Sequence, residues 1–111
     1  MGISTHVLDT TRGRPADGIG IILERELDDG TFERVADGST DADGRLKGLI
    51  EGEPPRGTYR LRFAIGEYFW RQGQRTFFPV AEVTFVVEKT TEHYHVPLLL
   101  NPFGYSTYRG S

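Results

Sequence analysis

Two histidines stand two positions apart near the end of this 111-residue chain, in the segment HYHVPLLL. His93 and His95 lie in a run with the alternation of a β-strand, so their side chains should share one face. One other histidine, His6, lies in the segment STHVLD. Imidazole binds zinc, and it also takes up and releases protons near neutral pH. Three histidines can therefore build a metal site or an acid–base site, and a third interpretation is a partly exposed pair with no chemical task.

The residues alone leave these interpretations open. A catalytic zinc site would take the three imidazoles as ligands and keep a fourth position free. An acid–base site would use imidazole near its unperturbed pKa of about 6.5. The chain has no cysteine, so a thiolate ligand, a disulfide framework and thiol chemistry are excluded.

Short β-strands must position these side chains, because apolar and polar residues alternate along most of the chain. Turn sequences such as DDG and TDADGR separate the strands. The segment GEYFWRQGQ breaks the alternation and is predicted to hold one or two helical turns. The strands are expected at Ile3–Asp9, Ile19–Leu27, Thr31–Gly38, Thr58–Ile65, Ala81–Glu88, His93–Leu100 and Tyr105–Arg109. The prediction is an all-β fold, an antiparallel β-sandwich of two roughly four-stranded sheets with one short helix.

The strand that carries the two histidines is apolar on both faces towards its end. One face is predicted to be core and consists of Tyr94, Val96, Leu98 and Leu100. The other face continues from the histidines to Pro97 and Leu99. A strand that is apolar on both faces usually has both faces covered. Because a two-layer sandwich has no third layer, we expect another subunit to provide the cover.

The composition is that of an ordinary soluble domain. The chain is 37% hydrophobic and 26% charged, which argues against disorder, and its length suits one domain over residues 1–111. Its net charge is −3, with basic residues scattered among acidic ones, so we expect no nucleic-acid partner. No apolar run approaches the roughly 18–20 residues that span a bilayer. The first residues also lack the pattern of a signal peptide, so a cytoplasmic protein without a membrane partner is expected.

Two longer segments resemble the signatures of a known family. HVLDTTRGRPADGIGI, from His6 to Ile21, and YHVPLLLNPFGYS, from Tyr94 to Ser106, are similar to the N-terminal and C-terminal signatures of the transthyretin family. Their order, their spacing and the chain length agree with the family as well, so the resemblance covers essentially the whole chain. It implies a transthyretin-like sandwich. The family contains a carrier of thyroid hormone and hydrolases of 5-hydroxyisourate, so fold alone does not settle function.

Four features match the hydrolase branch. They are a histidine that opens the first signature (His6), an arginine after an Asp-Gly turn (Arg45), a histidine in the second signature (His95) and the ending Tyr108–Ser111. The resemblance therefore implies that the chain hydrolyses 5-hydroxyisourate, the unstable product of urate oxidation. Water would add to a ring carbonyl and the ring C–N bond would open, which gives a ureido-imidazoline carboxylate.

The resemblance also implies roles for these residues. His6 and His95 would activate water and transfer protons, and the sequence does not say which of them is the general base. Arg45 would bind the substrate and stabilise the negative oxygen of the transition state, because its planar fork carries a fixed charge. No metal or other cofactor is implied.

The remaining expected roles concern the end of the chain and the second histidine of the pair. Ser111 would orient the substrate or a histidine through its hydroxyl or its terminal carboxylate, and Tyr108 would contact the substrate. Arg109 and Gly110 would hold Ser111 in place, and a backbone turn that favours glycine is expected at Gly110. His93 would support His95, with which it shares a face.

Family resemblance further implies a homotetramer, built as a dimer of dimers, with active sites in the cleft where the dimers meet. Two alternatives remain. A transthyretin-like carrier would bind a small ligand without turnover. A zinc-dependent hydrolase would hold stoichiometric metal on the three histidines and lose activity with chelators.

Overall fold

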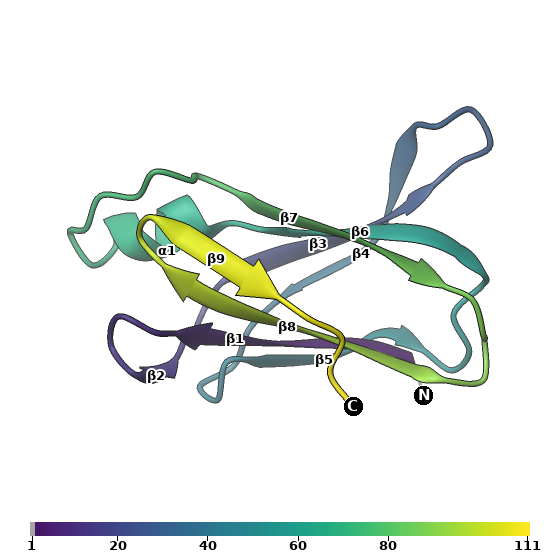
Figure 1. The fold of residues 1–111 in the computed structure, drawn as a ribbon, viewed down its shortest axis with the longest axis horizontal. Helices are drawn as coiled ribbons and strands as arrows, with labels where there is room; N and C mark the ends of the chain where they lie inside the picture. Colours follow the sequence, from purple (N-terminus) through teal and green to yellow (C-terminus); the bar gives the residue numbers. More distant parts are fainter. Residues whose placement is uncertain (1) are drawn as a thin grey trace.

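The computed structural model describes residues 2–111, which form two β-sheets packed face to face (Figure 1). One sheet has the order β2-β1-β8-β9, with β5 also paired to β1, and the other has the order β4-β3-β6-β7. The elements are β1 (Gly2–Asp9), β2 (Arg14–Pro15), β3 (Gly20–Glu26), β4 (Phe32–Ser39), β5 (Arg45–Glu51), β6 (Gly57–Phe63), α1 (Ile65–Trp70), β7 (Ala81–Val87), β8 (His93–Asn101) and β9 (Gly104–Thr107). The predicted all-β sandwich with one short helix is confirmed.

Two features of the first sheet differ from the sequence expectation. The pairing of β1 with β8 is parallel, whereas the other pairings are antiparallel. Strands β2 and β5 were not among the predicted strands. The two residues of β2 are too few to show a period, and in β5 a register shift opposite Ile3–Thr5 and the positive φ of Gly48 (69°) interrupt the alternation. Both features matter for the site, since β8 and β5 lie on opposite edges of β1.

The core between the sheets is apolar and follows the predicted alternation. Tyr59, Leu61 and Phe63 of β6 are fully buried. The predicted core face of β8 is buried as well, and consists of Tyr94, Val96, Leu98 and Leu100.

On the other face of β8, Pro97 is already buried within the single chain, whereas Leu99 is half-buried. A neighbouring subunit is therefore not needed to cover Pro97. A Cβ at Gly110 would lie 3.3 Å from the Pro97 ring, so the end of the chain itself packs against this residue. The expectation of a covering subunit is corrected at Pro97, and it stays a prediction for Leu99.

A buried carboxylate anchors the loop that follows β1. Asp9 is fully buried, and its Oδ1 accepts hydrogen bonds from the backbone N–H groups of Thr11 (3.0 Å) and Arg12 (3.2 Å). Its Oδ2 accepts a 2.7 Å hydrogen bond from the Tyr68 hydroxyl of α1. Burial, and then this hydrogen bond, raise the pKa of Tyr68. The contact ties α1 to the end of β1.

Replacing Tyr68 with phenylalanine should lower the free energy of unfolding by about 1.5–3 kcal/mol, the usual range for a hydrogen bond to a charged group. The ring would still pack, while Asp9 would lose one of its three donors. Urea denaturation measures the change. Tyr105→Phe is the matched control, because Tyr105 packs edge-on against Phe78 and the structure gives its hydroxyl no carboxylate partner within residues 2–111. Equal losses in the two variants would contradict the role of the Tyr68 hydroxyl.

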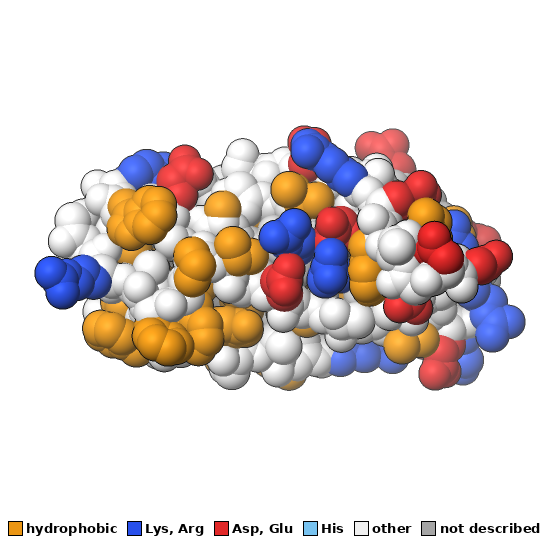
Figure 2. All heavy atoms as spheres, turned by 90° about the horizontal axis from the view of Figure 1, so that it is seen from above, with side chains coloured by type: hydrophobic (Ala, Val, Ile, Leu, Met, Phe, Trp, Pro, Cys, Tyr) orange, Lys and Arg blue, Asp and Glu red, His pale blue; other side chains and the backbone are white. Residues whose placement is uncertain are grey.

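Hydrophobic side chains gather on the surface at the end of the molecule that carries α1 (Figure 2). The most exposed of the large apolar residues there are Trp70 (65%), Phe77 (72%) and Phe103 (71%). Phe77 is held beside the β8–β9 turn, since its N–H donates to the carbonyl of Pro102 at 2.8 Å. Among the described residues, no helix is both long and apolar enough to cross a bilayer.

Candidate active site

The parallel register of β1 and β8 brings the two ends of the sequence together. Ser4 lies opposite His95, and His6 lies opposite Pro97. On the other edge of β1, antiparallel pairing with β5 sets His6 directly opposite Arg45. Three strands that are distant in sequence thus place two predicted histidines and the predicted arginine on one sheet.

A cavity of about 370 Å³ opens on this sheet. Its lining combines β1, β5, β8 and the end of the chain, and consists of Ser4, Thr5, Arg45, Lys47, Gly48, His93, His95 and Ser111. The structure therefore brings four of the predicted residues into one cavity: Arg45, His93, His95 and Ser111. His6 lies beside the cavity rather than in its lining.

His95 is half-buried, and its Nδ1 lies 2.8 Å from the hydroxyl oxygen of Ser4. Burial lowers the pKa of His95, and the nearby His6, His93 and Arg45 lower it further when they are positively charged. With Nδ1 engaged by Ser4, Nε2 is the ring nitrogen left to act on a molecule in the cavity. This neutral imidazole suits a general base at neutral pH.

His93 contacts the same serine from the other side. Its Nε2 lies 2.7 Å from Ser4 Oγ, and the ring centroids of His93 and His95 are 6.5 Å apart. Unlike His95, His93 is exposed. Ser4, which the sequence analysis did not single out, therefore connects the two histidines. Its place on the same face as His6 could be read from the alternation, but its contact with β8 depends on the strand register.

His6 has one ring nitrogen fixed. Its Nε2 lies 2.9 Å from the backbone carbonyl oxygen of Asp43. A carbonyl only accepts hydrogen bonds, so Nε2 carries the proton and donates. In the neutral ring the lone pair therefore sits on Nδ1.

The turn before β5 fixes Arg45 relative to His6. Asp41 Oδ1 accepts the backbone N–H groups of Asp43 (2.9 Å) and Arg45 (3.0 Å), and the hydrogen bond from Arg45 lowers the pKa of Asp41. Gly44 has φ +74°, and a Cβ there would lie 2.4 Å from the carbonyl oxygen of Val7. Only glycine fits this position, which explains the Asp-Gly pair before the arginine.

The end of the chain returns to His95. The backbone N–H of Gly110 donates to the carbonyl of His95 at 2.8 Å. A Cβ at Gly110 would lie 2.6 Å from Cδ2 of the His95 ring. Gly110 does not have a positive φ, so the expected backbone turn is wrong. Lack of space beside the imidazole explains the glycine, and the same contact carries Ser111 to the cavity.

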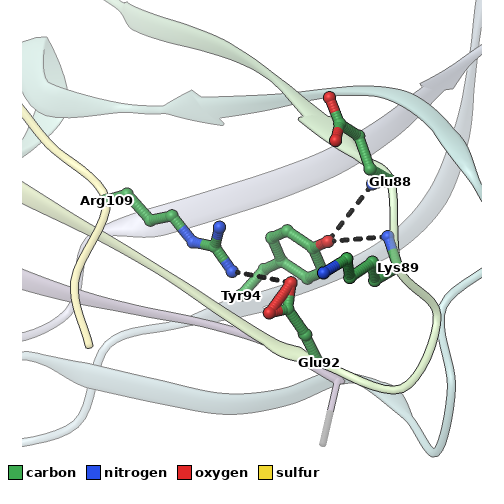
Figure 3. Close-up of polar contacts among 5 residues, drawn as sticks. All are labelled: Glu88, Lys89, Glu92, Tyr94 and Arg109. Atoms are coloured by element: carbon green, nitrogen blue, oxygen red, sulfur yellow. Dashed lines mark hydrogen bonds and ion pairs between the residues drawn. The ribbon is translucent and has the colours of Figure 1, made fainter.

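Arg109 anchors this ending through its contacts with Tyr94 and Glu92 (Figure 3). Its guanidinium lies 4.6 Å from the ring centroid of Tyr94, and its Nη2 lies 3.4 Å from Oε1 of Glu92. The Tyr94 hydroxyl accepts the backbone N–H groups of Glu88 (3.2 Å) and Lys89 (3.0 Å). Arg109 is thus placed to hold the backbone before Gly110 rather than to touch a ligand in the cavity.

Tyr108 lies in a different groove. It is 57% exposed and lines a cavity of about 330 Å³ together with residues of β7, among them Val83 and Phe85. Within the single chain Tyr108 therefore lies outside the histidine cavity. Its expected contact with a substrate stays a prediction.

The grouping of the three histidines bears on the zinc interpretation. Across residues 2–111, no three His, Cys, Asp or Glu side chains are grouped closely enough to hold a metal ion. His93 and His95 each direct a nitrogen at Ser4, and His6 directs one at a carbonyl. The arrangement suits proton transfer, and a chelator experiment tests the zinc interpretation.

Replacing Gly110 with alanine should displace the His95 ring, because the new Cβ would lie 2.6 Å from Cδ2. Overpacking of this kind costs about 1–3 kcal/mol. Gly104→Ala is the matched control, since the nearest atom to its Cβ would be 3.9 Å away. Thermal unfolding and the NMR shifts of the His95 imidazole report the two effects. Unchanged His95 shifts in Gly110→Ala would contradict the packing argument.

The chain is similar to known proteins over nearly its whole length. The model of the HIUase/Transthyretin family matches residues 3–110. The 5-hydroxyisourate hydrolase of Salmonella typhimurium is 48% identical over 110 residues, which cover 98% of this chain and 80% of the relative.

Solved structures of this family are also similar to the chain. Klebsiella pneumoniae 5-hydroxyisourate hydrolase superposes with a TM-score of 0.87 at 38% identity, covering 98% of each chain. Sea bream transthyretin in complex with thyroxine superposes with a TM-score of 0.92 at 35% identity, covering 97% of this chain and 93% of the other. Because the fold matches a hydrolase and a thyroxine complex alike, the residues of the cavity must decide between them.

Proposed function

This chain belongs to the HIUase/Transthyretin family, and on that basis we propose that it hydrolyses 5-hydroxyisourate in urate degradation. The observation that carries the proposal is the cavity that gathers His95, Arg45 and Ser111 beside His6. Relatives that match 98% of this chain are named 5-hydroxyisourate hydrolases. The product would be 2-oxo-4-hydroxy-4-carboxy-5-ureidoimidazoline.

In the proposed mechanism His95 is the general base. Its Nε2 takes a proton from water, and the resulting hydroxide adds to the ring carbonyl carbon of the substrate. The same nitrogen then returns the proton to the ring nitrogen as the C–N bond breaks. His6 lies across from Arg45, where the lone pair of its Nδ1 can accept a hydrogen bond from water or substrate.

Arg45 supplies the positive charge in this mechanism. Its side chain lines the cavity, and a guanidinium there stabilises the oxygen that becomes negative in the tetrahedral intermediate. Lys47 lies two residues further along β5 and lines the same cavity. Two cations suit a reaction whose product is a carboxylate. Ser111 completes the lining, and in the proposed mechanism its hydroxyl donates a hydrogen bond to the ring substituents.

Acid should inactivate the enzyme only below pH 6.5. Burial holds the pKa of His95 below its ordinary value of 6.5, so the neutral base persists as the pH falls to that value. Activity is lost as the pH falls further, through the lowered pKa. Because the folded protein disfavours the charged ring, the contribution of His95 to the free energy of unfolding is lost as the pH falls from 6.5 towards the lowered pKa. Profiles of kcat/KM against pH, with an NMR titration of His95, measure the effect, and a limb centred above 6.5 would contradict it.

A carrier function fits the cavity less well. The lining is built from two serines, a threonine, a glycine, two cations and two histidines, whereas pockets that only bind a drug-sized molecule are usually lined mostly by apolar side chains. A carrier would bind 5-hydroxyisourate or another ligand in stoichiometric amounts and would not convert it.

We further propose that the protein works as a homotetramer, a dimer of dimers. The support is the apolar end of the molecule around Trp70, Phe77 and Phe103, which is unusually exposed for a single chain. An open cavity on the outer face of a sheet also suits closure by a second copy. Light scattering after size exclusion tests the mass, and a monomer would contradict this part of the proposal.

A cytoplasmic location is proposed as well. The fold uses no disulfide, since the chain has no cysteine, so it does not require an oxidising compartment. Cell fractionation tests the location.

The test of function follows the product by ¹³C NMR. Urate oxidase generates 5-hydroxyisourate from labelled urate, and the protein is added at about one hundredth of the substrate concentration. We expect the carboxylate of the opened ring to accumulate over many turnovers, and chelator to leave the rate unchanged. Stoichiometric binding of 5-hydroxyisourate, with product formed no faster than in the absence of protein, would support a carrier. Activity lost with chelator and restored by zinc would support the zinc-dependent hydrolase.

A further inference from the structure

The hydroxyl of Ser4 lies between two imidazole nitrogens. Ser4 Oγ is 2.7 Å from Nε2 of His93 and 2.8 Å from Nδ1 of His95. Ser4 itself is buried, with 6% of its surface exposed. Both contacts are short, and both cross the parallel pairing of β1 and β8, which holds the serine in place.

The number of protons available in this contact restricts the tautomers that the two neutral histidines can adopt. A serine hydroxyl has one proton to donate and two lone pairs that accept. If Ser4 donates to His95 Nδ1, His93 Nε2 must donate to Ser4, and both neutral rings carry their proton on Nε2. If Ser4 donates to His93 Nε2, His95 Nδ1 must donate to Ser4, and both rings carry it on Nδ1. The neutral histidines are therefore in matching tautomers.

Mixed tautomers are disfavoured by the surroundings. If both rings donated to Ser4, its own proton would need a third partner, and within residues 2–111 the serine oxygen contacts only the two imidazoles. If neither ring donated, two lone pairs would face a hydroxyl with a single proton. A buried polar group left without a partner is costly, so the matched states prevail.

We propose that Ser4 is a positioning residue that passes a proton from His95 to His93 during hydrolysis, so that His95 changes tautomer while His93 becomes positively charged. The inference rests on the proposed function and deepens it. The two rings lie 6.5 Å apart between centroids and are bridged by the serine. Once His95 Nε2 has taken a proton from water, reversal of the two hydrogen bonds at Ser4 leaves that nitrogen able to give the proton back as an acid.

The proton transfers balance over one turnover. The reaction starts with both rings protonated on Nδ1. Water gives a proton to His95 Nε2, His95 Nδ1 gives its proton to Ser4 Oγ, and Ser4 gives its proton to His93 Nε2. Hydroxide adds to the carbonyl carbon while His93 carries the positive charge. When the ring C–N bond breaks, the transfers reverse, and His95 Nε2 gives the proton to the leaving nitrogen.

Charge distribution favours this route. His6 on β1, Arg45 and Lys47 on β5, and His93 on β8 are the basic groups around His95. A positive charge held on His95 would be half-buried among them, whereas the same charge on His93 reaches solvent. The relay moves the charge to the more exposed ring.

The tautomers of the free protein test the contact without reference to activity. Long-range ¹H–¹⁵N NMR of the histidine rings, recorded above their titration range, should show His93 and His95 both protonated on Nε2 or both on Nδ1. In Ser4→Ala the two rings should no longer be held in the same tautomer. His93 protonated on Nε2 together with His95 protonated on Nδ1 would overturn the relay, because both rings would then donate to Ser4.

Kinetics test the role in turnover. Ser4→Ala should lower kcat by roughly 10–100-fold, less than removal of a general base, with KM little changed. Ser4→Thr keeps the hydroxyl and should restore most of kcat. Thr10→Val is the matched control, since it removes a hydroxyl that donates to Leu100 across the same two strands, away from the histidines. Full kcat in Ser4→Ala would overturn the relay.

A second variant keeps the kinetic test possible if Ser4→Ala does not fold. His93→Gln keeps a hydrogen-bonding group next to Ser4 but cannot carry the proton onward, and His93 is exposed. His93→Gln should lower kcat as much as Ser4→Ala does. The double variant, Ser4→Ala with His93→Gln, should lower kcat no more than either single substitution. Full kcat in His93→Gln, or multiplied losses in the double variant, would overturn the relay. An inactive wild-type protein would instead overturn the proposed function, while the tautomer measurement would still decide the contact.

Discussion

Replacing His95 with alanine should lower kcat for 5-hydroxyisourate by roughly 10²–10⁴-fold, the range expected for loss of a general base. The imidazole is half-buried in the cavity, and its pKa is lowered, so it is the ring best suited to take a proton from water at neutral pH. The backbone carbonyl of residue 95, which accepts from Gly110, is kept in the variant. The substitution therefore removes the base without releasing the end of the chain.

His93→Ala is the comparison for this variant. His93 shares the contact with Ser4 but is exposed, and it acts on substrate only through the serine. Its loss should lower kcat less than the loss of His95. Initial rates of substrate disappearance, together with thermal unfolding of each variant, measure the ranking. A larger effect at His93 would show that the base has been assigned to the wrong ring.

The second large effect is expected at Arg45. Arg45→Ala should lower kcat by about 10²–10³-fold, as the loss of one stabilising group for a developing oxyanion does. The backbone N–H of residue 45 still donates to Asp41, and its carbonyl still accepts from Asp41 N–H at 2.9 Å. The turn and the pairing with His6 should survive, so the lost activity reports on the guanidinium.

Lys47→Ala is the matched control, because Lys47 contributes a second cation from the same face of β5 and lines the same cavity. A cation that only attracts the substrate should change KM more than kcat. Arg45→Lys should remain impaired, since an ammonium cannot reproduce the planar fork. If Lys47→Ala lowered kcat more than Arg45→Ala, the oxyanion would lie closer to the lysine than proposed.

Local patterns predicted most of the fold. The alternation in β6 and β8 correctly gave their buried faces, and the break in alternation gave the helix at Ile65–Trp70. Strand β5 was missed because a register irregularity and Gly48 hide its period. The parallel pairing of β1 with β8 could not be predicted, because it depends on contacts between opposite ends of the chain.

The site was predicted in part. Family resemblance pointed to Arg45, His95 and Ser111, which line one cavity, and to His6 beside it. Ser4 was missed, since a small polar residue within an apolar strand carries no signal until the partner strand is known. Lys47 was missed with its strand.

Tyr108 and Gly110 match the family motif, but their surroundings in the structure differ from those expected from the sequence. Tyr108 faces the groove beside β7 rather than the histidines. Gly110 is required by the close approach of His95 and not by its backbone conformation. Both depend on packing that no single segment specifies.

The most direct test of the central claim is the ultraviolet decay of 5-hydroxyisourate, generated from urate with urate oxidase at neutral pH. The account predicts that catalytic amounts of this protein accelerate the decay in proportion to protein concentration, and that His95→Ala loses most of the acceleration. Decay at the spontaneous rate in the presence of the folded wild-type protein would contradict it.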